Sequence, residues 1–126
     1  ETRVPGHADA RASNGAVMSP DRRDWDGAED VDLALVICGE DVPRRIPNGF
    51  QGFLSRVDQG GGRLGGIDGG TVILARIGHL DNRRAVVQEN DDGPFPDILL
   101  SDRPHILDDR RLTVAGGVAV GDAICA

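Results

Sequence analysis

The hydrophobic positions of the chain fall into short apolar runs separated by glycine-rich and acidic turns, a pattern that predicts alternating strands and helices. Residues 31–38 (V-D-L-A-L-V-I-C) form a nearly continuous apolar run that ends at Gly39, as expected for a fully buried parallel strand. Within residues 50–57 the apolar side chains recur at helical spacing, which predicts a short amphipathic helix that ends at the glycines 60–62.

A strand, a sharp turn and a helix are predicted to follow one another directly in the middle of the chain. Residues 63–67 predict a second strand, and the D-G-G sequence at 68–70 predicts a tight turn. Residues 71–77 then predict a helix that stops at Gly78.

The remaining sequence is richer in turns. Residues 1–30 predict a loop-rich lead-in with a short extended piece near 16–18, and the glycines at 116–117 predict the start of another helix. Further short extended pieces are predicted at residues 84–87, 98–100, 106–107 and 112–114, the last two as a hairpin-like pair or two edge strands. Strands that alternate with helices predict an α/β sheet.

The composition of the chain argues against two functional classes, nucleic-acid-binding modules and membrane-spanning proteins. The chain has 126 residues, 14 basic and 21 acidic side chains and a net charge of -7, which predicts one acidic domain. A nucleic-acid-binding module needs a basic stripe, so this balance argues against direct DNA contact. The pairs of arginines along the chain are interleaved with aspartates and predict solvated turns. No apolar run approaches the roughly 20 residues that a membrane span requires.

Cysteine and histidine positions do not predict metal chemistry. Cys38 and Cys125 lie far apart and no signal peptide is visible, so a reduced, cytoplasmic protein is expected. His7, His79 and His105 share no metal-ligand spacing with one another or with the cysteines, so no metal or cofactor is expected. Both cysteines are interpreted as inert small hydrophobic residues, and the two later histidines as surface residues.

Candidate ligand-binding residues follow the predicted strands, because open α/β sheets bind ligands beyond the carboxyl ends of their strands. Gly39-Glu40-Asp41 follows the first strand, and Asp68-Gly69-Gly70 follows the second. Asp68 occupies the sharp turn at which some hydrolases carry a nucleophile. Its carboxylate is interpreted as a helix N-cap, a ligand contact or a nucleophile, and the sequence leaves the three open. The G-G-I-D-G-G string lacks the G-x-G-x-x-G spacing of a dinucleotide site.

Four motifs in order carry a family resemblance. They are D-V-D-L-A-L-V-I-C-G-E-D-V-P at 30–43, G-R-L-G-G-I-D-G-G-T-V-I-L-A-R-I-G-H-L-D-N-R-R-A-V-V at 62–87, F-P-D-I-L-L-S-D-R at 95–103 and D-D-R-R-L-T-V-A-G-G-V-A-V-G-D at 108–122. Together with R-A-S-N-G-A-V-M-S-P-D at 11–21, the chain resembles the N-terminal, amidotransferase-like domain of ThiJ/PfpI type in AraC-family transcription regulators.

The resemblance implies a fold and a role. The expected fold is a flavodoxin-like, mostly parallel sheet with helices on both faces, as in class I glutamine amidotransferases. The expected role is ligand sensing and dimerisation, with DNA bound by a separate helix-turn-helix domain. Residues 1–126 are then expected to form a single sensor domain that is incomplete at both ends and lacks the DNA-binding part.

Departures from the family pattern argue against an enzyme. Asp68 stands where the enzymes of the superfamily place a nucleophilic cysteine, and Gln88 begins the Q-E-N string that replaces an H-W-E-like string. Nucleophile and base are thus both replaced. Glu40 occupies the usual second glycine position, and the stretch from Gln88 to Phe95 is shorter than in the family, which puts one helix in doubt.

The sequence therefore predicts a non-catalytic sensor of a small cationic or amino-acid-like effector. The candidate ligand-binding residues are Gly39, Glu40, Asp68, Gly69 and Gln88. The expected partners are the effector, a second copy of the chain and, through the separate domain, DNA, with no membrane. Two alternatives stay open: a ThiJ/PfpI-type hydrolase or hydratase with Asp68 as nucleophile, and a degenerate remnant without function.

Overall fold

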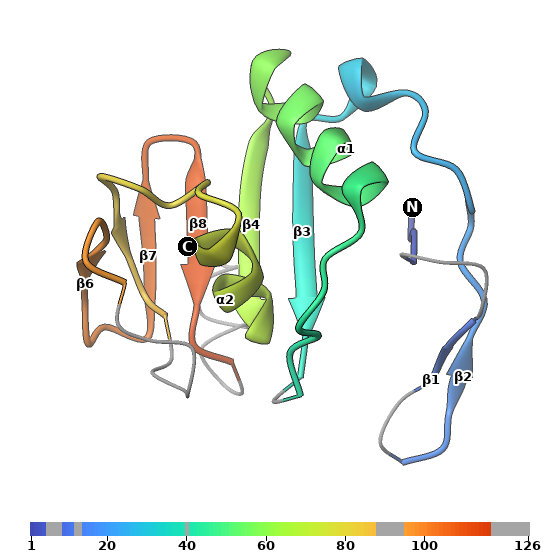
Figure 1. Ribbon diagram of the computed structural model, residues 1–126, viewed down its shortest axis with the longest axis horizontal. Coiled ribbons are helices and arrows are strands. Elements are labelled where there is room, and N and C mark those ends of the chain that lie inside the picture. The colour runs from blue at the N-terminus through green and yellow to red at the C-terminus, as the bar shows by residue number, and fades with distance from the viewer. Residues whose placement is uncertain (5–8, 12–13, 40, 88–94, 117–126) are drawn as a thin grey trace.

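A four-stranded mixed sheet forms the centre of the structure, a computed structural model that describes residues 1–4, 9–11, 14–39, 41–87 and 95–116. The strand order is β3-β4-β8-β7, with β3 and β4 parallel to β8 and β7 antiparallel to it (Figure 1). These strands are β3 (Leu33–Cys38), β4 (Arg63–Asp68), β7 (His105–Asp108) and β8 (Arg111–Val114). The strand run, the strand-turn-helix unit and the final hairpin that the sequence predicts are all confirmed.

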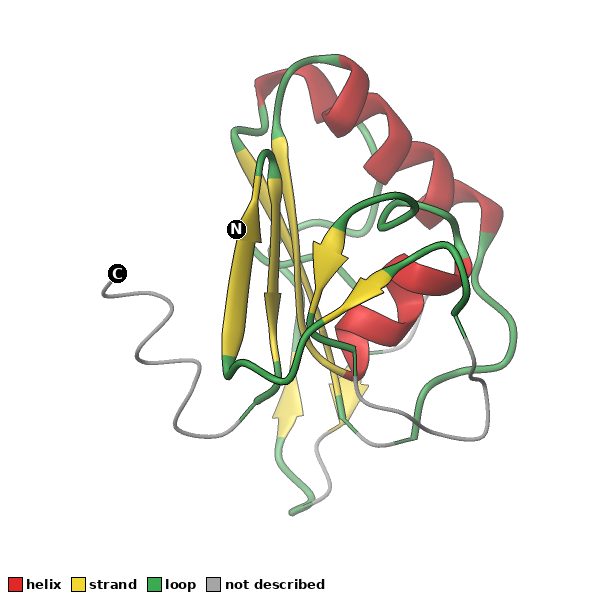
Figure 2. Ribbon diagram, turned by 90° about the vertical axis from the view of Figure 1, so that its left-hand side faces the viewer, coloured by secondary structure: helices red, strands yellow, loops and turns green. Residues whose placement is uncertain are grey.

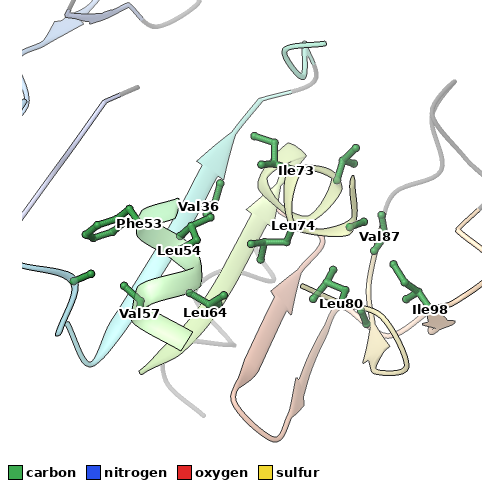
Figure 3. Close-up of a cluster of buried hydrophobic side chains, with 14 residues drawn as sticks. Val36, Phe53, Leu54, Val57, Leu64, Ile73, Leu74, Leu80, Val87 and Ile98 are labelled. Carbon is green, nitrogen blue, oxygen red and sulfur yellow. The ribbon is translucent and has the colours of Figure 1, made fainter. Parts of the chain in front are cut away.

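Two helices cover one face of this sheet (Figure 2). Helix α1 (Asn48–Gln59) connects β3 to β4, and α2 (Gly69–Arg76) begins directly at the end of β4. The amphipathic pattern of α1 is confirmed, since Phe53, Leu54 and Val57 are buried. Figure 3 shows these side chains beside Val36 and Leu64 of the sheet, where they form one core with residues of α2. Burial of such side chains is the main driving force for the association of helices and sheet.

The smaller elements flank the sheet. A 3-10 helix, η1 (Ala28–Asp30), precedes β3, and two short strand pairs complete the described elements. One pair is antiparallel, β1 (Ala10–Arg11) with β2 (Val17–Met18), and the other is parallel, β5 (Arg84–Ala85) with β6 (Leu99–Leu100). The helix predicted after Gly116 lies outside the described residues.

The expectation that β3 is fully buried is wrong. Val36 is 7% exposed, but Leu33, Leu35 and Ile37 are 46%, 39% and 72% exposed. Side chains alternate between the faces of a strand, and both described helices lie on the face to which Val36 points. The mixed α/β class is confirmed, but helices on both faces are not found among the described residues. A flavodoxin-like arrangement stays a prediction.

The N-terminal lead-in is held against α1 by aromatic and cationic contacts. Trp25 packs against Phe50 and Phe53, with ring centroids 5.5 and 5.4 Å apart. The Arg3 guanidinium lies 4.6 Å from the centroid of the Phe53 ring and donates hydrogen bonds to the carbonyls of Asp24 and Asp26. These contacts place the chain start beyond the edge of β3 (Figure 1).

Arg111 corrects the interpretation of the arginine pairs as solvated turns. Its side chain is 3% exposed and its Nε donates a 2.8 Å hydrogen bond to the carbonyl of His79. Its Nη2 lies 2.9 Å from Oδ1 of Asp58, and Arg110 pairs with the same oxygen at 3.2 Å. His79 itself is half-buried, not a surface residue as expected, because the loop that follows α2 packs over β8.

Candidate functional site at the strand ends

Asp68 forms the sharp turn between β4 and α2. Its backbone has φ 56° and ψ -123°, a conformation that costs a non-glycine residue about 1 to 3 kcal/mol. Its carboxylate makes no capping hydrogen bond to the helix, so the N-cap interpretation is correct for the position and wrong for the interaction. The turn is held instead by Thr71, whose Oγ1 donates a 2.8 Å hydrogen bond to the carbonyl of Asp68. The carboxylate is therefore left for another role.

The glycines after Asp68 allow the turn to approach β3. A Cβ added to Gly69 would lie 2.1 Å from the carbonyl oxygen of Gly39, and one added to Gly70 would lie 1.8 Å from that of Val36. Side chains larger than hydrogen are therefore excluded at both positions. The structure thus brings together three of the predicted site residues, Gly39, Asp68 and Gly69.

The other two predicted residues, Glu40 and Gln88, lie outside the described residues, so their place in the site stays a prediction.

Cys38 and Asp41 are close to Asp68 but are not among the five candidate ligand-binding residues that the sequence predicts, although Asp41 belongs to the turn after the first predicted strand. Cys38 stands opposite Asp68 in the register of β3 and β4, and its Sγ lies 3.9 Å from the carbonyl oxygen of Asp41. Burial raises the pKa of the Cys38 thiol above its ordinary value, and the carboxylates of Asp68 and Asp41 raise it further. The thiol is thus protonated at neutral pH, which agrees with an unreactive cysteine. Both residues could have been predicted from the sequence, because the ends of the adjacent parallel strands β3 and β4 lie side by side.

The residues that follow β8 border Asp68 on a third side, after the ends of β3 and β4. Gly116 has φ 109°, and a Cβ added there would lie 3.4 Å from Cβ of Asp68. The carboxylate therefore sits where the ends of β3, β4 and β8 converge, the edge of a parallel sheet at which ligands bind. Its residue is half-buried, so it is both sheltered and reachable from solvent.

A cavity of about 360 Å³ adjoins this point on the side of β3 and α1. Its walls include Cys38, Pro43, Phe50 and Ile73, with Arg3 and Arg45 as the charged residues. Asp68 is not among its described lining residues, and Cys38 is the residue that connects the two places. The strand-end site and this cavity are therefore neighbours, not one enclosed pocket.

Two further properties bear on the class of site. Among the described residues, no group of three or more His, Cys, Asp or Glu side chains is arranged to hold a metal ion. Within the same part of the chain, every helix is too short or too polar to cross a bilayer.

Comparison with known proteins shows sequence similarity to transcription regulators. No family model matches the chain. Over 116 residues it is 34% identical to the HTH-type transcriptional regulator CdhR of Pseudomonas aeruginosa, covering 86% of this chain and 33% of that protein. Over 119 residues it is 33% identical to the HTH-type transcriptional regulator GbdR of the same species, covering 88% of this chain and 31% of that protein.

The chain is homologous to part of these HTH-type regulators. It is also 27% identical over 106 residues to the HTH-type transcriptional regulator ArgR of Pseudomonas aeruginosa, covering 81% of this chain and 32% of that regulator. The expected relationship to transcription regulators is thereby confirmed. The chain spans about a third of the length of the curated regulators that it matches.

Solved structures of regulators share the fold. An AraC family transcriptional regulator from Pseudomonas putida superposes with a TM-score of 0.81 at 20% identity, covering 97% of this chain and 66% of that chain. A second, from Vibrio parahaemolyticus and described as a putative transcriptional regulator, gives 0.69 at 17% identity, with 96% of this chain and 70% of that chain covered. The mixed α/β architecture is therefore that of an AraC family regulator structure.

Proposed function

We propose that the chain is the ligand-sensing and dimerisation part of an AraC-type transcription regulator and responds to a small cationic or amino-acid-like effector. The observation that carries this is the carboxylate of Asp68, which stands at the convergence of three strand ends without a capping bond. Its strained backbone supports a functional role, since such strain persists where the surrounding structure holds a residue in place.

The charge of the site favours a cation. Asp68 and Asp41 both raise the pKa of Cys38 as negative charges, and Arg76 lowers it to a smaller extent, so the charge close to this thiol is mainly negative. In this proposal Glu40 and Gln88 complete the site, with Gly39 and Gly69 providing close backbone contact. A cationic group would be attracted by the carboxylates, and the adjoining apolar cavity would accept the rest of the ligand.

The response would pass from the site to a dimer. The effector shifts the protein toward one dimer geometry by its higher affinity for that state, and a helix-turn-helix domain outside these 126 residues reads the change on DNA. The net charge of -7 fits this division of labour, because an acidic domain is repelled by phosphates. Catalysis has no place in the proposal, since a protonated Cys38 beside Asp68 is no activated nucleophile.

Thermal unfolding in the presence of ligands tests the effector proposal. Tetramethylammonium and a set of free amino acids are compared with acetate as an anionic control, and a ligand present at 100 times its Kd stabilises by about 2.7 kcal/mol. The proposal expects a rise in Tm with at least one cation or amino acid and none with acetate.

The same measurement on Asp68→Asn and on Asp109→Asn gives the matched comparison. Asp109 lies in the turn between β7 and β8 and also has a positive φ, so its substitution controls for the loss of one charge. The rise in Tm is expected to disappear in Asp68→Asn and persist in Asp109→Asn. Equal responses in both variants would refute a role for Asp68, and a hydrolase or hydratase activity lost in Asp68→Asn would replace the sensor by an enzyme.

A further inference from the structure

An asparagine followed by a glycine occurs at two places in the sequence, Asn14-Gly15 and Asn48-Gly49, and the structure gives the two pairs different surroundings. Asn14-Gly15 lies in the loop between β1 and β2, a hairpin that stands apart from the central sheet (Figure 1). Asn48-Gly49 begins helix α1. Such a pair can lose the side-chain amide without an enzyme, because the backbone nitrogen of a glycine is unhindered and close to the amide carbon. The local fold therefore decides how readily each pair reacts.

The side chain of Asn14 is folded back over the peptide that follows it. Its Oδ1 accepts a 3.0 Å hydrogen bond from the amide of Ala16, the arrangement known as an Asx turn. Because the two bonded groups enclose the Asn14-Gly15 peptide, this bond keeps Cγ of Asn14 next to the backbone nitrogen of Gly15. The Ala16 N–H also points at the oxygen on which negative charge develops when Cγ is attacked, as backbone amides do in an oxyanion hole. The turn thus both orients and polarises the amide of Asn14.

Gly15 leaves the reacting atoms open to water. Its φ is 87°, a left-handed conformation that glycine adopts without strain. A Cβ added to it would have no atom of the described residues within 4 Å, and Asn14 and Ala16 are exposed as well. Water and dissolved bases therefore reach the backbone nitrogen of Gly15 and can remove its proton.

The second pair is held in place by α1. Asn48 and Gly49 are the first two residues of the helix, and the amide of Gln51 closes its first turn by donating to the carbonyl of Pro47 at 3.1 Å. A Cβ added to Gly49 would lie 3.1 Å from Cδ1 of Trp25, so the indole ring packs against this backbone. A reaction between Gly49 and the Asn48 side chain would twist the peptide out of its helical conformation and would require this turn to open. The helix therefore protects Asn48.

We propose that Asn14 is a site of spontaneous modification, at which the hairpin turn promotes conversion to aspartate and isoaspartate through a cyclic succinimide. The backbone nitrogen of Gly15 forms a bond to Cγ of Asn14 and gives up its proton, and the side-chain NH2 takes up a proton and leaves as ammonia. Water then adds to either carbonyl carbon of the succinimide and opens the ring. Water is the only co-reactant, and each conversion adds one negative charge to the protein. The reaction needs no effector and is independent of Asp68.

Peptide mapping of the unmodified chain tests the proposal. Trypsin cleaves after arginine, so residues 12–22 and 46–56 are released as separate peptides that each contain one Asn-Gly pair. The folded protein is incubated at neutral pH and physiological temperature, and the deamidated fraction of each peptide is followed by mass spectrometry. Asn14→Asp supplies the chromatographic standard for the aspartate product. The same incubation in guanidinium chloride gives the rate at each pair without the fold.

In the folded protein, deamidation of peptide 12–22 is expected to be at least about tenfold faster than that of peptide 46–56, because only Asn14 is oriented for attack. In guanidinium chloride the two rates are expected to become similar, with the rate at Asn14 no higher than in the folded protein. Asn14→Gln, whose longer side chain places its amide carbon farther from the Gly15 nitrogen, should abolish the modification of peptide 12–22.

The denatured chain shows what the fold contributes. Equal rates at the two pairs in the folded protein would mean that helix and hairpin do not differ, and would overturn the proposal. A slower rate at Asn14 in the folded protein than in guanidinium chloride would mean that the hairpin protects the residue. A difference between the two peptides that persists unchanged in guanidinium chloride would assign it to the neighbouring sequence, which also overturns a role for the turn.

Discussion

Arg111 of β8 and Asp58 of α1 form an ion pair with 2.9 Å between Nη2 and Oδ1, and the arginine side chain is 3% exposed. The pair ties the end of α1 to the far side of the central sheet, and the hydrogen bond to the His79 carbonyl adds the loop after α2. Buried charges of this kind are costly to leave without their partner.

Arg111→Met is therefore expected to lower the free energy of unfolding by about 3 kcal/mol, because the carbonyl of His79 loses its donor inside the protein. Urea denaturation measures the change. Asp109→Asn, which removes the exposed pair between Arg83 and Asp109, serves as the control and is expected to cost less than about 1 kcal/mol. Similar costs in the two variants would contradict the importance assigned to Arg111.

Gly70→Ala is expected to prevent close packing of α2 on β3. The added Cβ would lie 1.8 Å from the carbonyl oxygen of Val36, and a backbone oxygen has no room to move within the sheet. The expected loss is at least about 3 kcal/mol, enough to unfold a marginally stable domain.

Gly52→Ala is the matched control for Gly70→Ala. Gly52 lies inside α1, and its added Cβ would meet only the end of the flexible Arg56 side chain at 3.3 Å. Alanine is the better helix former, so this variant is expected to gain about 0.5 to 1 kcal/mol. Circular dichroism during heating should show shifts of opposite sign, and shifts of the same sign would contradict the close approach of α2 to β3.

The Cys38 thiol is expected to titrate at a higher pH than an ordinary cysteine, for which the pKa is about 8.5. In a Cys125→Ser background, the rate of reaction with iodoacetamide against pH reports its ionisation. Asp68→Asn removes one of the negative charges that raise the pKa of Cys38, so the midpoint should move to lower pH while burial keeps it above the ordinary value. An unchanged midpoint would show that the charge of Asp68 does not act on Cys38, and it would contradict the acidic character of the proposed site.

Acidification is expected to destabilise the fold in part through His79. Burial lowers the pKa of His79 below its ordinary value, and the neighbouring Arg111 lowers it further. The unfolded chain then binds a proton more readily than the folded one, so stability is complete above about pH 6.5 and falls as the pH decreases through the lowered pKa of the folded state.

His79→Gln keeps the backbone carbonyl that Arg111 uses and removes the titrating ring. The free energy of unfolding of this variant should depend less on pH between about 7 and 5 than that of the parent chain. Parallel pH profiles for the two proteins would show that His79 contributes nothing to acid sensitivity.

Relief of the strain at Asp68 is expected to separate stability from ligand response. Asp68→Gly places the residue that tolerates φ 56° and ψ -123° in the turn, and should raise the free energy of unfolding by about 1 kcal/mol after the entropic cost of glycine. Under the proposed function the same variant loses its Tm response to the cation or amino acid. Lower stability would indicate that the carboxylate stabilises the fold.

Local patterns in the sequence were sufficient for most elements of the fold. The helical spacing around Phe53 and Val57, and the direct passage from strand to helix at Asp68, depend on interactions between residues close in sequence, so both were predictable. The exposure of Ile37 was not, because an apolar run has the same pattern whether one or both faces of the strand are covered. Arg111 was misjudged for a related reason: its partners Asp58 and His79 are distant in sequence.

The candidate site was predictable to a similar extent. Asp68, Gly69 and Gly39 follow strands, and parallel strands bring their ends together, so their proximity could be inferred from order alone. The place of Cys38 opposite Asp68 required the register of β3 and β4, which depends on packing across the sheet. The absence of a capping bond at Asp68 required the actual backbone angles of the turn.

Trp25 gives the molecule a reporter of its own. It is the single tryptophan of the sequence, it lines a cavity of about 220 Å³ beside β3, and its ring contacts Phe50 and Phe53. Indole emission shifts to shorter wavelength when water leaves its surroundings. Any molecule that enters this cavity should thus be visible in the intrinsic fluorescence of the unlabelled protein.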